Sequence, residues 1–175
     1  MDVVQAALDF GFSHAALMDP ATLRPREEVR DMCAADRCHS YGKSWMCPPG
    51  CGPLEDNVRI LADFREGLLV QTTAVLDDPY DYETMMAAGA LQKRRLLDFR
   101  EKLLADYPGL VALGNGACTV CEECTYPSKP CCHPDEAVSS MEAFGLVVSD
   151  ACTENGLGYY YGPGTITYTG CYLLA

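Results

Sequence analysis

Eleven cysteines in a chain of 175 residues are the feature that most constrains this sequence. Nine of them fall in two short runs, residues 33–51 and 118–132, while Cys152 and Cys171 stand alone. Small secreted disulfide scaffolds are usually shorter and contain more than roughly 8–10% cysteine, whereas this chain contains about 6%. The odd number also prevents complete pairing. The pattern therefore favours metal-binding thiols in a reducing compartment, where disulfides are rare.

The second cysteine-rich segment, residues 118–134, carries the more specific spacing. It begins Cys118-x2-Cys121-x2-Cys124 and reaches Cys131 after six further residues. Three thiolates at this spacing on a glycine-preceded loop can converge on one cubane cluster, as in bacterial ferredoxins. Zinc is the competing ion, but its sites usually combine two separate pairs of ligands. The spacing predicts a [4Fe-4S] cluster in which Cys131 supplies the fourth thiolate.

The first cysteine-rich segment, residues 33–53, follows no simple zinc-finger or ferredoxin spacing. Its cysteines, separated by four, eight and three residues, are Cys33, Cys38, Cys47 and Cys51. Pro48 and Pro49 stiffen the backbone after Cys47, and the neighbouring glycines permit close approach to an ion. We predict a second cluster here, which gives one or two [4Fe-4S] clusters in the chain, with zinc as the alternative.

Several other residues are not expected to be metal ligands. His39 and His133 each adjoin a cysteine and are expected at the surface. Cys152 and Cys171 lie in apolar surroundings and are expected to be buried, inert thiols. Glu142 is interpreted as a charge at a helix N-terminus, with an outer-shell hydrogen-bond acceptor as the alternative.

Helices and strands alternate in the predicted secondary structure. Helices are expected over residues 2–10, 26–34, 54–65 and 82–106, with one or two more in 139–155, and strands over 14–18, 68–76, 110–113 and 165–174. Gly67 is expected to end the third helix. This order predicts an α/β or α+β fold, with a small sheet of about four strands covered by helices. Residues 1–175 then form a single domain, and the two metal loops, 33–53 and 118–134, lie within it.

Periodicity also predicts which helix faces are buried. For residues 54–65 the predicted face is Leu54, Val58, Leu61 and Ala62, and for the long helix it is Met86, Ala90, Leu97, Leu104 and Tyr107. Five of the thirteen basic residues fall within 93–102. We interpret this run as a solvated helix face, with a docking patch for an acidic partner as the alternative.

Charge and the motifs that the sequence lacks exclude several functions. The 25 acidic and 13 basic residues give a net charge of −12, which would repel nucleic acid and anionic membranes. No apolar run approaches the roughly 18 residues of a membrane span. The chain contains no Walker loop, G-x-S-x-G or H-E-x-x-H motif. Because the first residues show no signal pattern, a cytoplasmic location is expected.

Four motifs together resemble one known family. They are Cys33-x4-Cys38, Tyr41-Gly42-x-x-Trp45-x-Cys47-Pro48-Pro49, Cys118-x2-Cys121-x2-Cys124-x6-Cys131 and Ser140-Met141-Glu142-Ala143-x-Gly145. The family is the uncharacterised one of small predicted metal-binding proteins, domain of unknown function twenty-two eighty-four. The resemblance implies iron–sulfur or other metal binding by the seven cysteines in these motifs, but no known reaction. Cys51 lies outside the family pattern, and Cys132 stands where an arginine commonly follows the fourth cysteine.

These observations favour a cytoplasmic iron–sulfur protein that passes single electrons to a redox partner protein in an anaerobe. It would be a redox carrier rather than a catalyst, and its acidic surface suits docking to a basic partner. One alternative is a cluster-bearing enzyme or accessory subunit, in which three cysteines of the first segment leave an iron open. Another is a structural zinc-binding interaction module.

Overall fold

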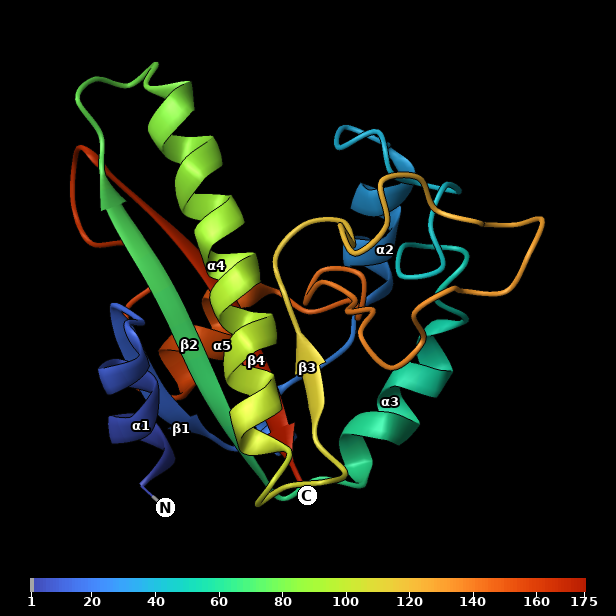
Figure 1. Ribbon diagram of the computed structural model, residues 1–175, viewed down its shortest axis with the longest axis horizontal. Coiled ribbons are helices and arrows are strands. Elements are labelled where there is room, and N and C mark those ends of the chain that lie inside the picture. Colours follow the sequence, from blue (N-terminus) through green and yellow to red (C-terminus); the bar gives the residue numbers. More distant parts are fainter. Residues whose placement is uncertain (1) are drawn as a thin grey trace.

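The computed structural model describes residues 2–175 and contains one four-stranded antiparallel sheet (Figure 1). The strand order is β1-β2-β4-β3, with bounds β1 His14–Met18, β2 Glu66–Val75, β4 Thr165–Leu174 and β3 Val111–Leu113. The helices are α1 Val3–Phe10, α2 Glu27–Ala34, α3 Leu54–Ala62, α4 Tyr82–Leu103 and α5 Val148–Glu154, with a short 3-10 helix, η1, at Pro20–Thr22. The predicted α+β class and the small covered sheet are confirmed.

The two long central strands hold the sheet together. β2 and β4 pair along their full length, from Glu66 opposite Leu174 to Val75 opposite Thr165. Residues 67–72 of β2 and 169–174 of β4 are buried, and because side chains alternate between the two sides of a strand, this burial includes both faces of the sheet. This two-sided burial explains why the strands read as nearly continuous apolar and β-branched runs.

Helices cover both faces of the sheet. On one face, α1 and α4 pack over Leu68, Val70 and Tyr172. On the other face, α3, α5 and the segment 141–146 pack over Leu69 and Leu173. The sheet therefore lies between two apolar layers, and it provides a fixed scaffold for the loops that leave its β3 edge.

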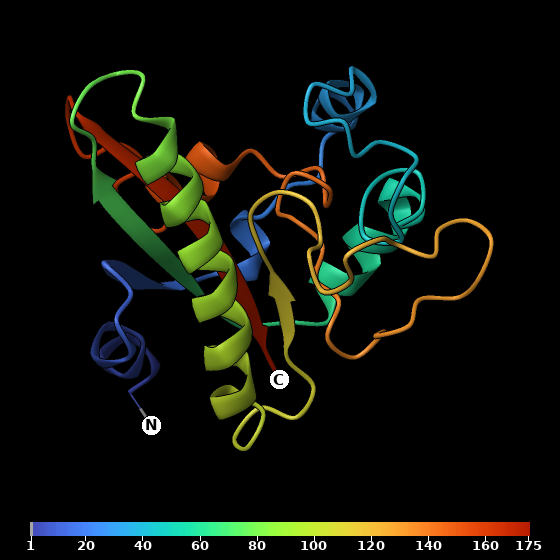
Figure 2. The ribbon, with the colours of Figure 1, turned by 45° about the horizontal axis from the view of Figure 1, so that its top comes forward.

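Both cysteine segments lie beyond that edge, together with α2. We call this part, residues 27–53 and 115–138, the cysteine lobe. Figures 1 and 2 both show it on the β3 side of α4, with the two loops side by side. Segments 65 residues or more apart in the sequence are thus brought together next to the sheet.

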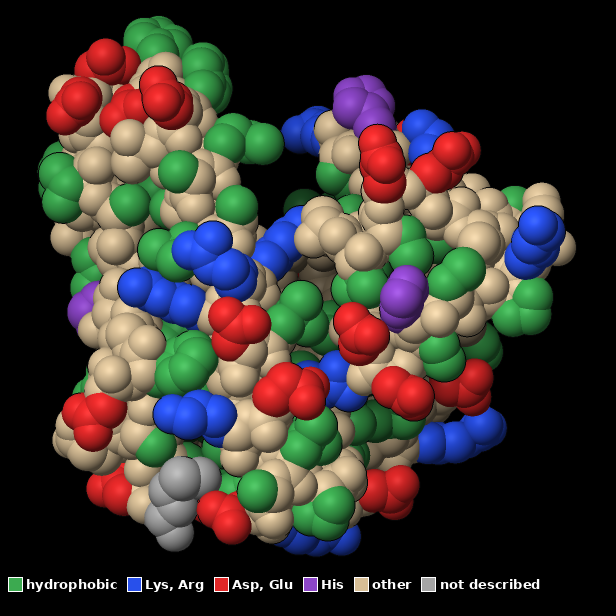
Figure 3. Space-filling model, viewed as in Figure 1, with side chains coloured by type: hydrophobic (Ala, Val, Ile, Leu, Met, Phe, Trp, Pro, Cys, Tyr) green, Lys and Arg blue, Asp and Glu red, His purple; other side chains and the backbone are tan. Residues whose placement is uncertain are grey.

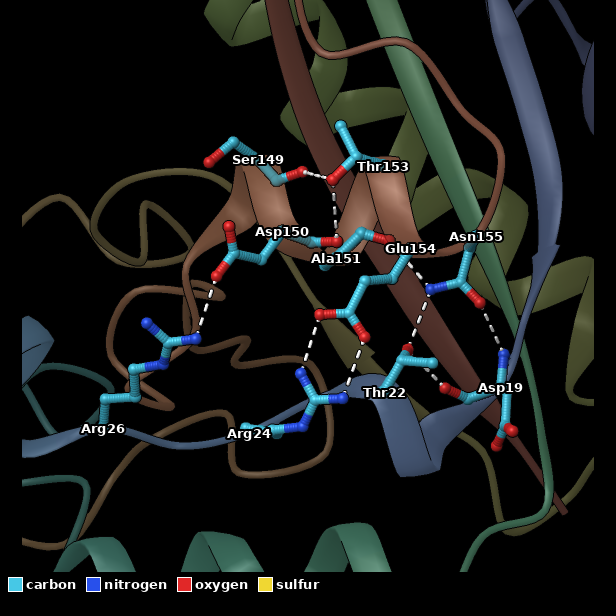
Figure 4. A network of polar contacts seen from close by, with 10 residues as sticks. All are labelled: Asp19, Thr22, Arg24, Arg26, Ser149, Asp150, Ala151, Thr153, Glu154 and Asn155. Carbon is cyan, nitrogen blue, oxygen red and sulfur yellow. Dashed lines mark hydrogen bonds and ion pairs between the residues drawn. The ribbon is translucent and has the colours of Figure 1, made fainter.

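A polar network fixes the segment that leads into the lobe (Figure 4). Arg24 forms a bidentate ion pair with Glu154 of α5, at 2.7 and 2.9 Å, and Arg26 pairs with Asp150 at 3.0 Å. The Asn155 side chain accepts a hydrogen bond from the Asp19 amide at 2.9 Å. These contacts hold the start of α2, and hence Cys33, relative to the sheet.

The predicted face of α3 is half right, and that of α4 is wrong. In α3 the predicted Leu54 and Leu61 are buried, but Val58 is 50% exposed and Asn57 is buried in its place. In α4 the predicted Met86 is 75% exposed, and the buried stripe is Ala88, Gly89, Gln92, Leu96, Phe99 and Leu103. The stripe contains a polar residue because Gln92 accepts a hydrogen bond from the Thr72 hydroxyl at 2.6 Å, which hydrophobic periodicity does not reveal.

Other differences are local. Gly67 does not follow a helix but lies inside β2, where a side chain would overlap Met18 and the Tyr172 carbonyl. α3 ends at Ala62 rather than Arg65, α4 ends at Leu103 rather than Asp106, and only one helix forms within 139–155. Among residues 2–175, no helix is both long and apolar enough to cross a membrane.

Candidate metal centres

Four cysteines of the second segment face one cavity of about 180 Å³. They are Cys118, Cys121, Cys124 and Cys131. The opposite wall comes from the first segment, including Ser44, Trp45 and Met46. Cys132 is exposed and does not line this cavity. The four thiols that the spacing selects thus line one cavity, and we call this cavity the second site.

The base of this loop is closed by backbone hydrogen bonds. β3 ends at Leu113, and the next residue, Gly114, donates its amide to Ser139 at 2.8 Å and accepts from the Met141 amide at 3.0 Å. A loop whose two ends are joined in this way can hold its side chains in place without regular secondary structure. The closure explains how 24 loop residues, 115–138, present thiols to one cavity.

Cys124 occupies an environment that stabilises a thiolate. Burial alone would raise its pKa, but the backbone N–H groups of Tyr126 and Trp45 and the Ser44 hydroxyl lower the pKa below its usual value. At Cys121 the pKa is raised, first by burial and then by the charge of Cys132 and the other thiols of the segment. Donors directed at a ligand sulfur are a common means of tuning metal sites.

Three cysteines of the first segment border a larger pocket of about 460 Å³. Cys33 comes from the last turn of α2, while Cys38 and Cys47 come from the loop that follows. Burial and the nearby thiols of Cys38, Cys51 and Cys33 raise the pKa of Cys47 to about 11. We call this pocket the first site.

Cys51 is close to this group but does not line its pocket. It borders a separate open groove of about 730 Å³ together with Cys131 of the other segment. Its Sγ atom lies 3.9 Å from the Ala143 carbonyl oxygen. Cys51 therefore faces a different pocket from the other three cysteines of its segment.

Arg30 supplies a positive charge beside the first site, and the sequence analysis missed it. Its guanidinium donates to the Ala143 carbonyl at 2.7 Å and to the Gly52 carbonyl at 3.0 Å. Its Nη2 atom is buried without a partner among residues 2–175. Burial raises the pKa values of Cys33 and Cys51, and the Arg30 charge opposes this rise at both.

Glu142 occupies a different place from the one predicted. No helix begins at this residue, since α5 starts only at Val148. Instead Glu142 is an exposed residue at the wall of the first site, where partial desolvation by the surrounding protein raises its carboxyl pKa. Its backbone carbonyl lies 4.0 Å from Cys33 Sγ.

The two sites share walls. Ser40 and Ala117 each line both the first and the second site. The Trp45 indole donates to the Lys129 carbonyl at 2.9 Å, and its ring meets Tyr126 edge-on with ring centroids 4.9 Å apart. The two cysteine segments are therefore interlocked, and their sites are neighbours.

The remaining candidates lie where they were expected. His39 and His133 are exposed at the rim of the second site, and Cys152 and Cys171 are fully buried away from both sites. Within residues 2–175, no group of three or more His, Cys, Asp or Glu side chains is gathered closely enough to hold a metal ion. The ligand roles of individual cysteines thus stay predictions.

The donor set suits soft metals. Thiolates select iron–sulfur clusters, zinc or copper(I) over hard cations. Four thiols around one cavity, with N–H groups directed at the sulfur of Cys124, fit an iron–sulfur cluster and also satisfy the ligand count of a zinc site.

Comparison with known proteins gives one match. No curated protein and no solved structure is significantly similar to the chain. A family model does match residues 16–174, which is nearly the whole chain, and its description is "Predicted metal-binding protein (DUF2284)". The resemblance that the cysteine motifs suggested is thereby confirmed. The chain belongs to this family of predicted metal-binding proteins.

Proposed function

We propose that this protein is an iron–sulfur electron carrier. In this proposal, Cys118, Cys121, Cys124 and Cys131 hold one [4Fe-4S] cluster in the second site. The observation that carries the proposal is that these four thiols line one cavity whose other wall comes from the first segment. A cluster held there supplies one-electron transfer, and the residues around it supply its enclosure and its hydrogen bonds.

A second cluster in the first site completes the proposal. Cys33, Cys38 and Cys47 face that pocket, and Cys51 is the remaining cysteine of the segment. The walls shared by the two sites favour exchange of electrons between them. All eleven cysteines are free thiols, the state that a reducing cytoplasm maintains, and the net charge of −12 suits docking to a basic redox partner protein.

The test is purification without oxygen, followed by iron, sulfide and zinc analysis and a visible spectrum. About eight iron and eight sulfide per chain, with broad brown absorption, would support two cubane clusters. About four of each would support the second site alone. Zinc without sulfide would overturn the proposal and favour a structural zinc module.

One observation favours a second candidate function, in which the first site is catalytic. Three thiols face its pocket of about 460 Å³, while Cys51 borders a different groove. A cluster with three protein thiolates leaves one iron free to bind a small molecule. The protein would then be a cluster-bearing enzyme or an accessory subunit of one.

Cys51→Ala distinguishes the two candidates. If Cys51 is a ligand, the variant loses the iron of the first site or gains an open coordination position that wild type lacks. If the iron is already open, the variant keeps its iron, and the electron paramagnetic resonance spectrum of reduced wild type changes on addition of cyanide. A wild-type spectrum insensitive to cyanide contradicts the catalytic candidate.

A further inference from the structure

Lys93 departs from the solvated helix face predicted for residues 93–102. It projects from the middle of α4 toward the cysteine lobe, and its Nζ atom donates to the Ala117 carbonyl at 2.7 Å. Among residues 2–175 it takes part in no salt bridge. Figure 3 shows basic side chains over the middle of α4, beside a hollow between this helix and the cysteine lobe.

The residue that Lys93 contacts belongs to both sites. Ala117 lines the first site beside Cys33, Cys38 and Cys47, and it also lines the second site. It directly precedes Cys118, and Lys93 and Cys118 line a further small cavity together. The ammonium is therefore fixed at the wall between the two groups of thiols.

Electrostatics agrees with this placement. Burial lowers the pKa of Lys93, and negative charge at Cys118 and Cys47, which a thiolate ligand carries, opposes that effect. One of these thiolates belongs to each site, so the same ammonium acts on both. By contrast, the Arg30 charge acts on Cys33 and Cys51, which both belong to the first segment.

We propose that Lys93 is a counter-ion shared by both metal sites, where it favours the reduced state of each. This inference rests on the proposed iron–sulfur function. Each cluster that accepts one electron from an external reductant gains one negative charge. A fixed positive charge in a partly buried wall stabilises that added charge, because Coulomb interactions are stronger away from bulk water. Lys93 thus provides a fixed positive charge near both sites and is not a ligand.

The test is a redox titration of the anaerobically purified protein, with each cluster followed by electron paramagnetic resonance. Lys93→Met keeps the length of the side chain but removes its charge, and should lower both midpoint potentials without changing the iron or sulfide content. Lys93→Arg retains the charge and should keep both potentials near those of wild type. Arg94→Met removes an exposed charge from the next residue of α4 and should change neither.

The outcomes separate this inference from the proposed function. If both clusters are present and Lys93→Met lowers one potential or neither, the shared role is overturned while the iron–sulfur function stands. If Lys93→Arg lowers the midpoint potentials as much as Lys93→Met does, the shared role is also overturned, because altered packing rather than the lost charge would then be the cause. Wild-type protein with only one filled site overturns the shared role, and protein without sulfide overturns the proposed function and the inference together.

Discussion

At the scale of single residues, two adjacent thiols have different surroundings. Cys131 and Cys132 are neighbours, and either could follow the C-x2-C-x2-C motif. The structure distinguishes them, since Cys131 lines the second site and Cys132 is exposed outside it. The spacing along the chain limits which cysteines can reach one site. The way each side chain points depends on how the loop is closed.

We expect Cys121→Ala to remove the second cluster, because three remaining thiols do not complete its ligand set. Iron should fall by about half, from roughly eight to roughly four per chain, and the loop should lose stability since metal binding is coupled to folding. Metal analysis and thermal unfolding measure the two effects. Cys132→Ala is the matched control and should keep all its iron. Unchanged metal content in Cys121→Ala would contradict the assignment.

Residues that act on the sites from outside the loops were not predictable in the same way. Arg30 and Lys93 lie on α2 and α4, and nothing in their local sequence points to the two sites. Each acquires its place through tertiary contacts, such as the bond from Lys93 to Ala117. A motif can indicate candidate ligands because ligand chemistry restricts the residue type, but a charge near a ligand can come from any element.

At the scale of elements, the strands were predicted more accurately than the helix faces. β1 and β4 have the predicted bounds, because Asp19-Pro20 ends the apolar run of β1 and β4 is one continuous apolar and β-branched run. The buried stripe of α4 differs from the predicted one because Gln92 is buried through its hydrogen bond to Thr72. The existence of an element follows from local sequence, whereas its orientation depends on what packs against it.

Gly67 provides a test of how tightly β1, β2 and β4 pack. In Gly67→Ala the added methyl group would overlap Met18 and lie 2.9 Å from the Tyr172 carbonyl oxygen. Overpacking of this kind typically costs about 1–3 kcal/mol of stability, which denaturant unfolding measures. In Gly109→Ala the new atom would lie 3.5 Å from its nearest neighbour, Ala175, so we expect a change within about 0.5 kcal/mol. Equal stability of the two variants would contradict this packing.

At the scale of the whole molecule, the apolar core and the cysteine lobe are largely separate. The two core clusters lie on the faces of the sheet, and neither contains a cysteine of the two cysteine segments. The sheet can therefore keep its structure when the sites are disturbed. The sequence indicated this division, since its cysteine-free stretches predicted the scaffold, but it could not show that the two loops meet at one edge.

Removal of metal should consequently loosen the lobe and spare the sheet. After chelation under reducing conditions, we expect trypsin to cut first at Arg37 and Lys43, which are exposed in the first loop. Arg59 and Arg94 are equally exposed but lie on helices, and they should stay protected. Mass spectrometry of the fragments and far-ultraviolet circular dichroism provide the measurements. Early cleavage at the helical sites, or loss of the dichroism signal, would contradict a separate lobe.

The shared walls of the two sites also have a consequence for the order of events during synthesis. Cys33 leaves the ribosome first, yet its pocket is bounded by Gly116, Ala117 and Ala143, the last of which is made about 110 residues later. At typical rates of about 5–20 residues per second, the delay is roughly 6–22 s. During this interval the earlier thiols have no enclosure. Both sites therefore become complete only late in translation, and the metal that they are proposed to hold would enter a nearly finished chain.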